Sequence, residues 1–410
     1  MTCEVILVNM IFKRFILNTL KDELPRPEVN ILLGARQVGK TTLMRGLEAY
    51  AKDRGLKTHF YDLEQPSVLA DFNRSDSELI NMFKESGDVV FVDEFQYLQN
   101  ASKIFKALFD AKSKIKIFCS GSSSLQIHKH LKESLAGRRF LYRVYPLTLD
   151  EIKQHLKEYS LEQYLLYGGL PGLLHEPEVK RKQQILNELL GSFILKDIKS
   201  LVKEENIRAF NQLMYLLAEN QGSTISMTNL ANQINMSTKA INRYLDILEQ
   251  TYVNYRIYSY SNNLGNELKK SCKTYLYDLG IRNIILKDFS GVTQRKDRGT
   301  LFETFVYLKL QTLLEPNSEI KFWRTKDGDE VDFILVKDRK PFPVEVKANL
   351  EKNEIPRGLN RFLLRYKNTT QAFLINQKER GCIEHHSCKI HFLTFEDFSK
   401  WDRTFLDNLG

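Results

Sequence analysis

The fold of the N-terminal part of the chain follows from one segment, Asn30-Ile-Leu-Leu-Gly-Ala-Arg-Gln-Val-Gly-Lys-Thr-Thr42. It begins with a short apolar run typical of a buried strand. The residues Gly34–Thr41 then follow the pattern GxxxxGK[ST] of a phosphate-binding loop, and a helical pattern continues over Thr42–Ala51. Strand, loop and helix in this order predict a site for the phosphates of a nucleotide, because backbone amides and the helix N-terminus converge on the anion.

This loop is expected to bind ATP together with Mg²⁺. Lys40 is expected to reach the β- and γ-phosphates, and the Thr41 hydroxyl is expected to ligate Mg²⁺. A glycine loop that arose by chance is the alternative, and the flanking strand and helix argue against it. The predicted nucleotide-binding residues are Gly34, Ala35, Arg36, Gln37, Val38, Gly39, Lys40, Thr41 and Thr42.

A second apolar strand, Asp88–Val92, ends in the two acids Asp93 and Glu94. Such a strand can lie beside the first. Asp93 would then hold the metal ion through water, so that Asp93 and Thr41 are the two predicted metal-binding residues of this site. Glu94 would orient and polarise the attacking water. Most acid pairs after a strand merely cap it. Because this pair follows a phosphate-binding loop, the catalytic interpretation is favoured.

Two further residues are candidates for contacts with the transferred phosphate. A third strand, Ile115–Cys119, ends in a serine-rich turn, in which Ser120 is the first choice and Ser122 the second for a side chain near the γ-phosphate or the water. A simple turn explains the serines equally well. Arg138 follows Gly137 and is a candidate for stabilising charge in the transition state, although exposed arginine pairs are common.

The spacing of the apolar runs predicts an α/β fold with a parallel sheet. Short strands alternate with helical patterns between Val29 and Pro146, which is typical of strands joined by crossover helices. The expected strands are Asn30–Leu33, Lys57–Asp62, Asp88–Val92 and Ile115–Cys119.

A helix-turn-helix pattern follows a mainly helical region. Thr228–Ile234 and Thr238–Thr251 read as two helices, and strand-like segments follow at Tyr255–Tyr260 and Thr274–Tyr277. This order predicts a winged helix. Such modules either bind nucleic acid or serve only in packing, with nucleic-acid contact slightly favoured. The residues expected to touch DNA are Lys239, Asn242 and Arg243 on the second helix and Lys269, Lys270 and Lys273 beside the wing.

The last constellation is a set of acids and one lysine on neighbouring strands. Asp332 lies near the start of one apolar strand, and Glu345 and Lys347 share a face of the next because side chains alternate along a strand. Asp332 and Glu345 can hold Mg²⁺ while Lys347 positions or deprotonates water, and Glu303 on the preceding helix is a third acid. The alternative is a hairpin with a solvated polar face.

Taken together, these segments resemble a family of prokaryotic AAA-type ATPases that end in a restriction-endonuclease-like domain. The resemblance implies ATP binding with Mg²⁺ and hydrolysis, and a C-terminal fold of the PD-(D/E)XK type, for which Glu303, Asp332, Glu345 and Lys347 match the pattern. The matching stretches are Leu33–Thr42, Val90–Glu94, Cys119–Ser123, Leu135–Arg138, Tyr167–Pro171, Tyr275–Gly280, Trp323–Arg324, Glu330–Asp332 and Val344–Lys347.

The expected organisation is thus a P-loop parallel-sheet core, a helical lid, a winged helix and a mixed α/β nuclease-like domain. The chain has 410 residues, which fits two to four domains. The expected boundaries are 1–27 for a helical lead-in, 28–150 for the core, 151–222 for the lid, 223–290 for the winged helix and 291–410 for the last domain.

The amino-acid composition indicates which kind of binding partner and which cellular compartment to expect. The formal net charge of +9 favours a phosphate-bearing partner such as DNA. The five cysteines contain no CxxC pair, which is typical of a reducing compartment. The apolar stretch from Val5 to Ile11 is too short for a membrane span and runs into Lys13 and Arg14, so a cytoplasmic location is expected, with no membrane partner.

Three functions remain open at this point. The first is an ATPase that binds DNA through a nuclease-like domain, with or without cleaving it. The second is a nucleotide-gated switch or scaffold, whose nuclease-like domain binds a partner without cutting and which could assemble as a homo-oligomer. The third, which the sequence favours least, is a remodeller of proteins.

Overall fold

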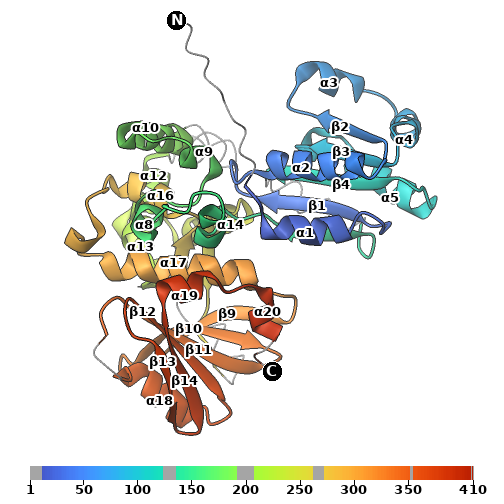
Figure 1. Ribbon diagram of the computed structural model, residues 1–410. Helices are drawn as coiled ribbons and strands as arrows, with labels where there is room; N and C mark the ends of the chain where they lie inside the picture. The colour runs from blue at the N-terminus through green and yellow to red at the C-terminus, as the bar shows by residue number, and fades with distance from the viewer. Residues whose placement is uncertain are drawn as a thin grey trace, which may run out of the picture. The chain divides into compact units, whose positions relative to one another are not determined.

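The computed structural model describes residues 12–122, 135–191, 207–261, 272–350, 354–407 and 409 (Figure 1). They form two compact units: unit 1 comprises Met1–Leu147 and Glu151–Glu158, and unit 2 comprises Thr148–Asp150 and Tyr159–Gly410. The apolar stretch from Val5 to Ile11 lies outside the described residues. Within the described ranges, no helix combines the length and the apolar character that a membrane span requires.

Unit 1 is built on a five-stranded sheet with the order β2-β3-β4-β1-β5, in which every neighbouring pair is parallel. The predicted α/β class and parallel sheet are confirmed. The fifth strand was not predicted, because its sequence, Arg-Phe-Leu-Tyr-Arg, is half polar. The strands are β1 (Val29–Gly34), β2 (Thr58–Asp62), β3 (Val89–Asp93), β4 (Lys116–Ser122) and β5 (Arg139–Arg143).

The sheet order corrects one expectation about the acidic strand. β3 does not lie beside β1, because β4 pairs with both and separates them. Since all strands are parallel, Gly34, Asp93 and Ser122 end their strands at the same edge. The helices of unit 1 are α1 (Phe15–Asp22), α2 (Lys40–Asp53), α3 (Pro66–Asp71), α4 (Asp76–Glu85) and α5 (Ala101–Asp110), and α7 (Leu149–Lys153) spans the boundary between the units.

Unit 2 begins with helices joined by a buried carboxylate. Asp278 caps α16 by accepting from the amide of Ile281 at 3.1 Å, and it also accepts from the amide of Gly169 at 2.8 Å. This links the Gly-Gly-Leu-Pro turn to α16, which is why the backbone near Gly168 has no room for a side chain. These helices are α8 (Leu161–Tyr167), α9 (Pro171–Leu174), α10 (Val179–Leu189), α12 (Ile207–Glu219) and α16 (Leu279–Leu286).

A three-stranded sheet with the order β6-β8-β7 follows, accompanied by two helices. Ser226 and Ser237 cap these helices by accepting from backbone amides of their first turns, so each helix starts near where the sequence indicated. The elements are β6 (Thr224–Ile225), α13 (Met227–Gln233), α14 (Thr238–Gln250), β7 (Asn254–Ile257) and β8 (Cys272–Leu276).

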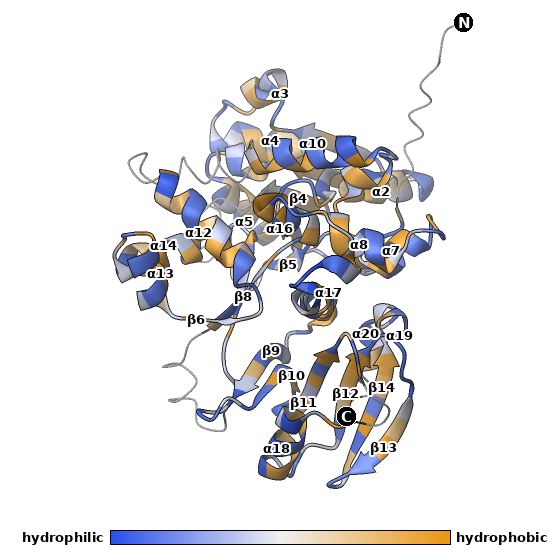
Figure 2. Cartoon of the chain, turned by 90° about the vertical axis from the view of Figure 1, so that its left-hand side faces the viewer, coloured by the Kyte–Doolittle hydropathy of each residue, from blue (hydrophilic) through white to orange (hydrophobic). Residues whose placement is uncertain are grey.

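The C-terminal part of unit 2 is a mixed six-stranded sheet with the order β13-β14-β12-β11-β10-β9. Helices α17 and α18 pack on opposite faces of this sheet, because Tyr307 of α17 stacks on Phe333, whereas Phe362 of α18 shares a cluster with the next residue, Ile334. Figure 2 shows hydrophobic residues along β12 and β14. The elements are α17 (Arg298–Leu313), β9 (Ser318–Arg324), β10 (Glu330–Lys337), β11 (Lys340–Lys347), α18 (Arg357–Arg365), β12 (Gln371–Asn376), β13 (Gly381–His385), β14 (Cys388–Thr394), α19 (Phe395–Ser399) and α20 (Arg403–Asp407).

Helix α18 packs its backbone directly against β10. A Cβ atom on Gly358 would lie 1.8 Å from the carbonyl oxygen of Glu330, so only glycine fits there. Next to this contact, Phe362 and Leu363 bury their side chains in one cluster with Val331 and Trp323. The position of α18 on the sheet therefore depends on one glycine.

We expect Gly358→Ala to destabilise unit 2 by roughly 2–3 kcal/mol, because the helix must move away from the strand. Gly299→Ala in α17 is the matched control, since nothing lies within 4 Å of its added Cβ, and it should leave stability unchanged or slightly higher. Urea unfolding followed by tryptophan fluorescence measures this, because Trp323 and Trp401 both belong to unit 2. Equal unfolding midpoints for the two variants would contradict the packing argument.

Candidate functional site

The phosphate-binding loop connects the end of β1 to the start of α2. Gly34 ends β1 so close to the chain after β5 that a Cβ would lie 2.2 Å from the carbonyl oxygen of Val144. Gln37 and Gly39 have positive φ angles of 59° and 91°, which turn the loop into the helix. Because Gly39 has no side chain, it leaves the first amides of α2 uncapped. The local backbone thus matches the predicted anion site.

Lys40 lies inside the curve of this loop. Its Nζ donates hydrogen bonds to the carbonyl oxygens of Gly34 at 3.0 Å and Ala35 at 2.9 Å. Burial lowers the pKa of Lys40, while the carboxylates of Glu94 and Asp93 oppose the shift. Among the other predicted loop residues, Ala35 and Val38 are buried, Arg36 is half-buried, and Gln37, Thr41 and Thr42 are exposed.

The Asp93 carboxylate accepts hydrogen bonds from three other predicted site residues. Its Oδ2 accepts a hydrogen bond from the Thr41 hydroxyl at 2.6 Å, and its Oδ1 accepts from the Ser120 hydroxyl and from the Glu94 amide. The intervening strand β4 is what brings Ser120 to this carboxylate. Hydroxyl and carboxylate oxygens are ligands that Mg²⁺ prefers, so Thr41 and Asp93 fit the predicted metal role.

Glu94 is held by a neighbour that sequence reasoning missed. It has a positive φ of 50°, and the Gln96 amide donates a hydrogen bond to its Oε2. A second acid, Glu64, lies close by: burial raises its pKa, and the charge of Glu94 raises it further. The position of Gln96 two residues after Glu94 was the available signal, whereas nothing in the sequence marked Glu64.

Arg138 is not brought to the loop of its own chain. Its carbonyl oxygen accepts from the Val29 amide at the start of β1, which is the edge of the sheet opposite to the loop. Its guanidinium donates to Asp110 at the end of α5, with Nε 2.6 Å from Oδ1. Parallel strands explain this placement, since a residue that precedes a strand lies far from the residues that follow one. The side chain of Ser122 is outside the described part of the structure.

The carboxylate cluster of unit 2 forms on β10 and β11. Phe333 pairs with Val344, so Asp332 and Glu345 face each other at the next position. The Glu345 carboxylate accepts from the Asp332 amide at 3.3 Å, and Asp332 accepts from the Val346 amide at 2.9 Å. The register of β10 on β9 shifts between Val331 and Ile334, and such bulges often re-aim side chains at functional sites.

Burial and neighbouring charges shift the pKa values of Glu303, Glu345 and Lys347. Burial raises the pKa of Glu345 to about 8, with Asp332 adding to the shift and Lys347 opposing it. Burial likewise raises the pKa of Glu303 to about 7, opposed by the charge of Lys273. Lys347 lies 2.7 Å from Glu345, and 40% of its side chain is exposed. The four predicted residues are therefore brought together, with Lys347 at the solvent side.

Three residues of the cluster were missed or misplaced. Lys273 on β8 was expected on a DNA-binding wing, but it is buried and pairs with Glu303 at 3.0 Å and Glu330 at 2.6 Å. Burial alone would lower the pKa of Lys273, whereas these carboxylates and Asp332 raise it. The Tyr275 hydroxyl donates to Glu303 at 2.6 Å. An apolar strand that carries Lys273 and Tyr275 on one face was the available signal.

A metal ion in this cluster would be coordinated by two acidic side chains. In the described ranges, no three His, Cys, Asp or Glu side chains are arranged to hold a metal. Asp332 and Glu345 are nevertheless adjacent, and the charge of Asp332 raises the pKa of Glu345, an effect that a bound divalent cation would relieve. The donor set therefore fits Mg²⁺ or Mn²⁺ with water completing the shell.

The second helix of the helix-turn-helix presents its polar face to solvent. Lys239, Asn242 and Arg243 on α14 are exposed, while Ile241 and Leu245 are buried. The Asn242 amide is engaged with the carbonyl oxygen of Thr238 at 2.9 Å. Lys269 and Lys270 lie outside the described residues.

Comparisons with known families divide the chain into three segments. Residues 26–153 match a family model described as an AAA domain, and this supports an AAA-type ATPase. Residues 158–296 match a domain of unknown function (DUF8612), and residues 298–392 match another (DUF4143).

Relatives match over most of the chain. An uncharacterised protein of Mycobacterium tuberculosis, Rv2008c, is 26% identical over 80% of this chain and 72% of its own length. The uncharacterised protein MJ1637 of Methanocaldococcus jannaschii is 26% identical over 79% of this chain and 77% of its own. Among solved structures, the Walker-type ATPase PABY2304 of Pyrococcus abyssi is 17% identical, with a TM-score of 0.47 over 67% of this chain and 96% of its own.

We expect the free energy of unfolding of unit 2 to fall as pH rises from about 5 to about 8 in buffer containing EDTA. The folded pKa values of Glu303 and Glu345 exceed the ordinary value of 4.5, so the folded state holds more protons across this range and loses that advantage as they leave. Urea unfolding at several pH values, followed by tryptophan fluorescence, measures the slope.

Glu345→Gln should flatten this slope and become more stable than the unsubstituted chain at pH 8, by on the order of 1–3 kcal/mol. Glu384→Gln is the matched control, because Glu384 is exposed on β13. A slope that stays the same in Glu345→Gln would show that the buried acid is not the titrating group.

Proposed function

We propose that the protein is an ATPase of the AAA type that binds ATP with Mg²⁺ and hydrolyses it in unit 1. The single observation that carries the proposal is the convergence of Thr41, Ser120 and Glu94 on the Asp93 carboxylate beside the phosphate-binding loop. These residues come from the C-terminal parts of two strands, β3 and β4, and from the start of helix α2. Their agreement with the AAA match over residues 26–153 supports nucleotide hydrolysis rather than a structural glycine loop.

Each residue has a distinct part in the proposed reaction. Lys40 exchanges its bonds to the loop carbonyls for the phosphate oxygens, and its low-dielectric position strengthens that attraction. Glu94, oriented by Gln96, accepts a proton from the attacking water. Thr41 and Asp93 would hold Mg²⁺, which when bound neutralises charge on the phosphates. Ser120 keeps Asp93 oriented and can turn toward the γ-phosphate.

Lys40→Ala should abolish nucleotide binding, and Glu94→Gln should retain binding while lowering turnover roughly 10²–10³-fold, because only the proton acceptor is lost. Calorimetry with an ATP analogue and a phosphate-release assay measure the two quantities. Lys84→Ala is the matched control, since Lys84 is an exposed lysine of α4 in the same unit. Normal turnover in both site variants would overturn the assignment.

For unit 2 we propose a winged helix for DNA binding and a nuclease-like metal site of the PD-(D/E)XK type. The winged-helix proposal is supported by the order of the elements, which is α12, β6, α13, α14, β7, β8. In a winged helix, two strands follow the second helix of the helix-turn-helix. The adjacency of Asp332, Glu345 and Lys347 supports the nuclease-like metal site. Lys347, which is partly exposed, would position the water that attacks a phosphodiester.

One observation favours the alternative of a nucleotide-gated scaffold without cleavage. Lys273 already places a positive charge between Glu303 and Glu330, as a bound cation would. The cluster could then serve stability and partner binding alone. Cleavage and scaffolding therefore differ in whether Asp332 and Glu345 bind a metal that acts on DNA.

With Mn²⁺, supercoiled and linear DNA should be cut by the unsubstituted chain, and Asp332→Asn or Lys347→Ala should lower the rate at least about 100-fold, since each removes a part of the metal and water site. Glu384→Gln serves as the surface control. Cutting that persists in both site variants would exclude this cluster as its source. Intact DNA, combined with a size-exclusion profile that differs between ATP and ADP, would favour the scaffold.

A further inference from the structure

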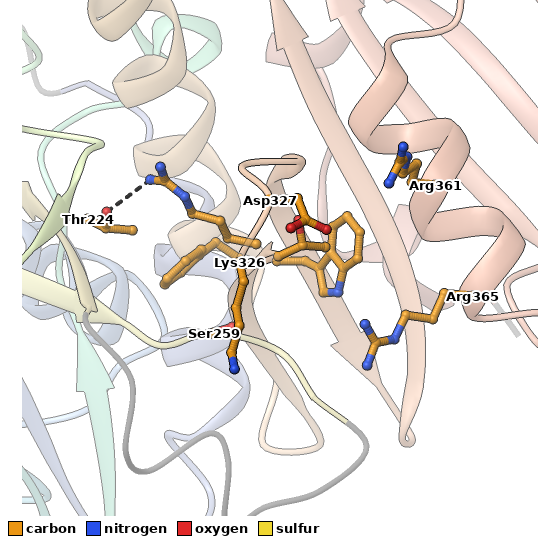
Figure 3. A pocket seen from close by; sticks show the side chains of 10 residues that line it. Thr224, Ser259, Lys326, Asp327, Arg361 and Arg365 are labelled. Atoms are coloured by element: carbon orange, nitrogen blue, oxygen red, sulfur yellow. Dashed lines mark hydrogen bonds between the residues drawn. The ribbon is translucent and has the colours of Figure 1, made fainter.

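A pocket of about 710 Å³ opens in unit 2 beside the hairpin between β9 and β10 (Figure 3). Arg361 and Arg365 of α18 lie on one side of it, and Thr224 of β6 lies on the opposite side. The hairpin between β9 and β10 contributes the pocket wall between these two sides. The complete lining is Thr224, Ser259, Phe322, Trp323, Arg324, Thr325, Lys326, Asp327, Arg361 and Arg365.

The lining is strongly basic. Four cations, Arg324, Lys326, Arg361 and Arg365, face one acid, Asp327. Arg361 also pairs with Asp329 at 3.1 Å, whereas among the described residues Lys326 and Arg365 have no ion pair. Such a charge excess in a concave site attracts an anion, and guanidinium groups match the geometry of phosphate oxygens.

The basic surface continues past the pocket along α18. Arg357, Arg361 and Arg365 recur every fourth residue on the exposed face of this helix, so they are spaced by about 6 Å. The opposite face carries the buried residues Leu359 and Phe362. A row of cations of this kind suits a polymer with regularly spaced charges better than a single small anion.

A short chain of ion pairs joins the pocket to the carboxylate cluster. Arg324 donates to the Thr224 hydroxyl at 3.0 Å and lies 3.4 Å from Glu330. Glu330 in turn pairs with Lys273, which pairs with Glu303. One wall of the pocket is therefore also one side of the cluster that was proposed to act on phosphodiesters.

We propose that this pocket binds the phosphodiester backbone of a DNA strand next to the carboxylate cluster, with Lys326 and Arg365 as its main phosphate contacts. This inference rests on the proposed DNA-binding function of unit 2. Arg361 and Arg357 extend the track along α18, and Arg324 fixes the wall nearest the acids. The pocket thereby orients the strand, while Asp332, Glu345 and Lys347 carry the chemistry.

The test is fluorescence anisotropy of the full chain with a labelled DNA oligonucleotide at several salt concentrations. Lys326→Glu/Arg365→Glu should weaken binding at least about 10-fold and reduce the slope of log affinity against log salt by roughly 2, as expected for two lost phosphate contacts. Lys378→Glu/Lys389→Glu is the matched control, because it makes the same charge change at exposed lysines beside β12 and on β14, across the sheet from β9.

The control should alter affinity less than about 3-fold, and both double variants should keep the urea unfolding midpoint of the unsubstituted chain. Equal affinities of the two double variants, with DNA bound by the unsubstituted chain, would overturn the pocket assignment alone. Absence of DNA binding by the unsubstituted chain would overturn both the pocket and the DNA-binding part of the proposed function. ATP turnover should be unchanged in all of these variants, since every substitution lies in unit 2.

Discussion

The carboxylate of Asp93 is the constraint on which the proposed nucleotide site depends. It accepts hydrogen bonds from Thr41, from Ser120 and from the amide of Glu94, so it ties together the start of α2 and the ends of β3 and β4. These groups can meet because all neighbouring strands of the sheet run parallel and end at one edge. The three hydrogen bonds hold the buried carboxylate in one orientation, and this is the preorganisation that a metal-assisted phosphoryl transfer requires.

The sequence was sufficient for the parts of unit 1 in which local chemistry and tertiary structure agree. The apolar runs of β1, β3 and β4 and the loop after β1 each carry their own signal. Two features of unit 1, the strand order and strand β5, could not be predicted from such local patterns. Strand order depends on contacts between segments far apart, so the position of β4 between β1 and β3 could not be read from any one run. Strand β5 is half polar and so carries a weak signal. The candidate Arg138 precedes β5, and only the parallel pairing of β5 with β1 shows that it lies at the edge of the sheet opposite to the loop.

For the carboxylate cluster of unit 2, too, the sequence predicted the residues on neighbouring strands but not the contacts between distant segments. Alternation along β11 correctly placed Glu345 and Lys347 on one face, and the pairing of β10 with β11 brought Asp332 to them. Lys273 was wrongly expected at the surface, because it follows Lys269 and Lys270 and such a basic stretch is typical of an exposed segment. Its burial follows only from the packing of β8 against α17, where the carboxylates of Glu303 and Glu330 offset the cost of removing an ammonium group from water.

The ion pairs of Lys273 also affect how the chain can be divided. The boundary between the second and third matched segments falls at residues 296–298, so it separates Lys273 and Tyr275 from Glu303 and Glu330. A fragment that started at Arg298 would contain the acids but not their buried counterion, and like charges would then repel in a low-dielectric interior. The two segments form one electrostatic unit, and they are best expressed, and compared with relatives, as a single piece.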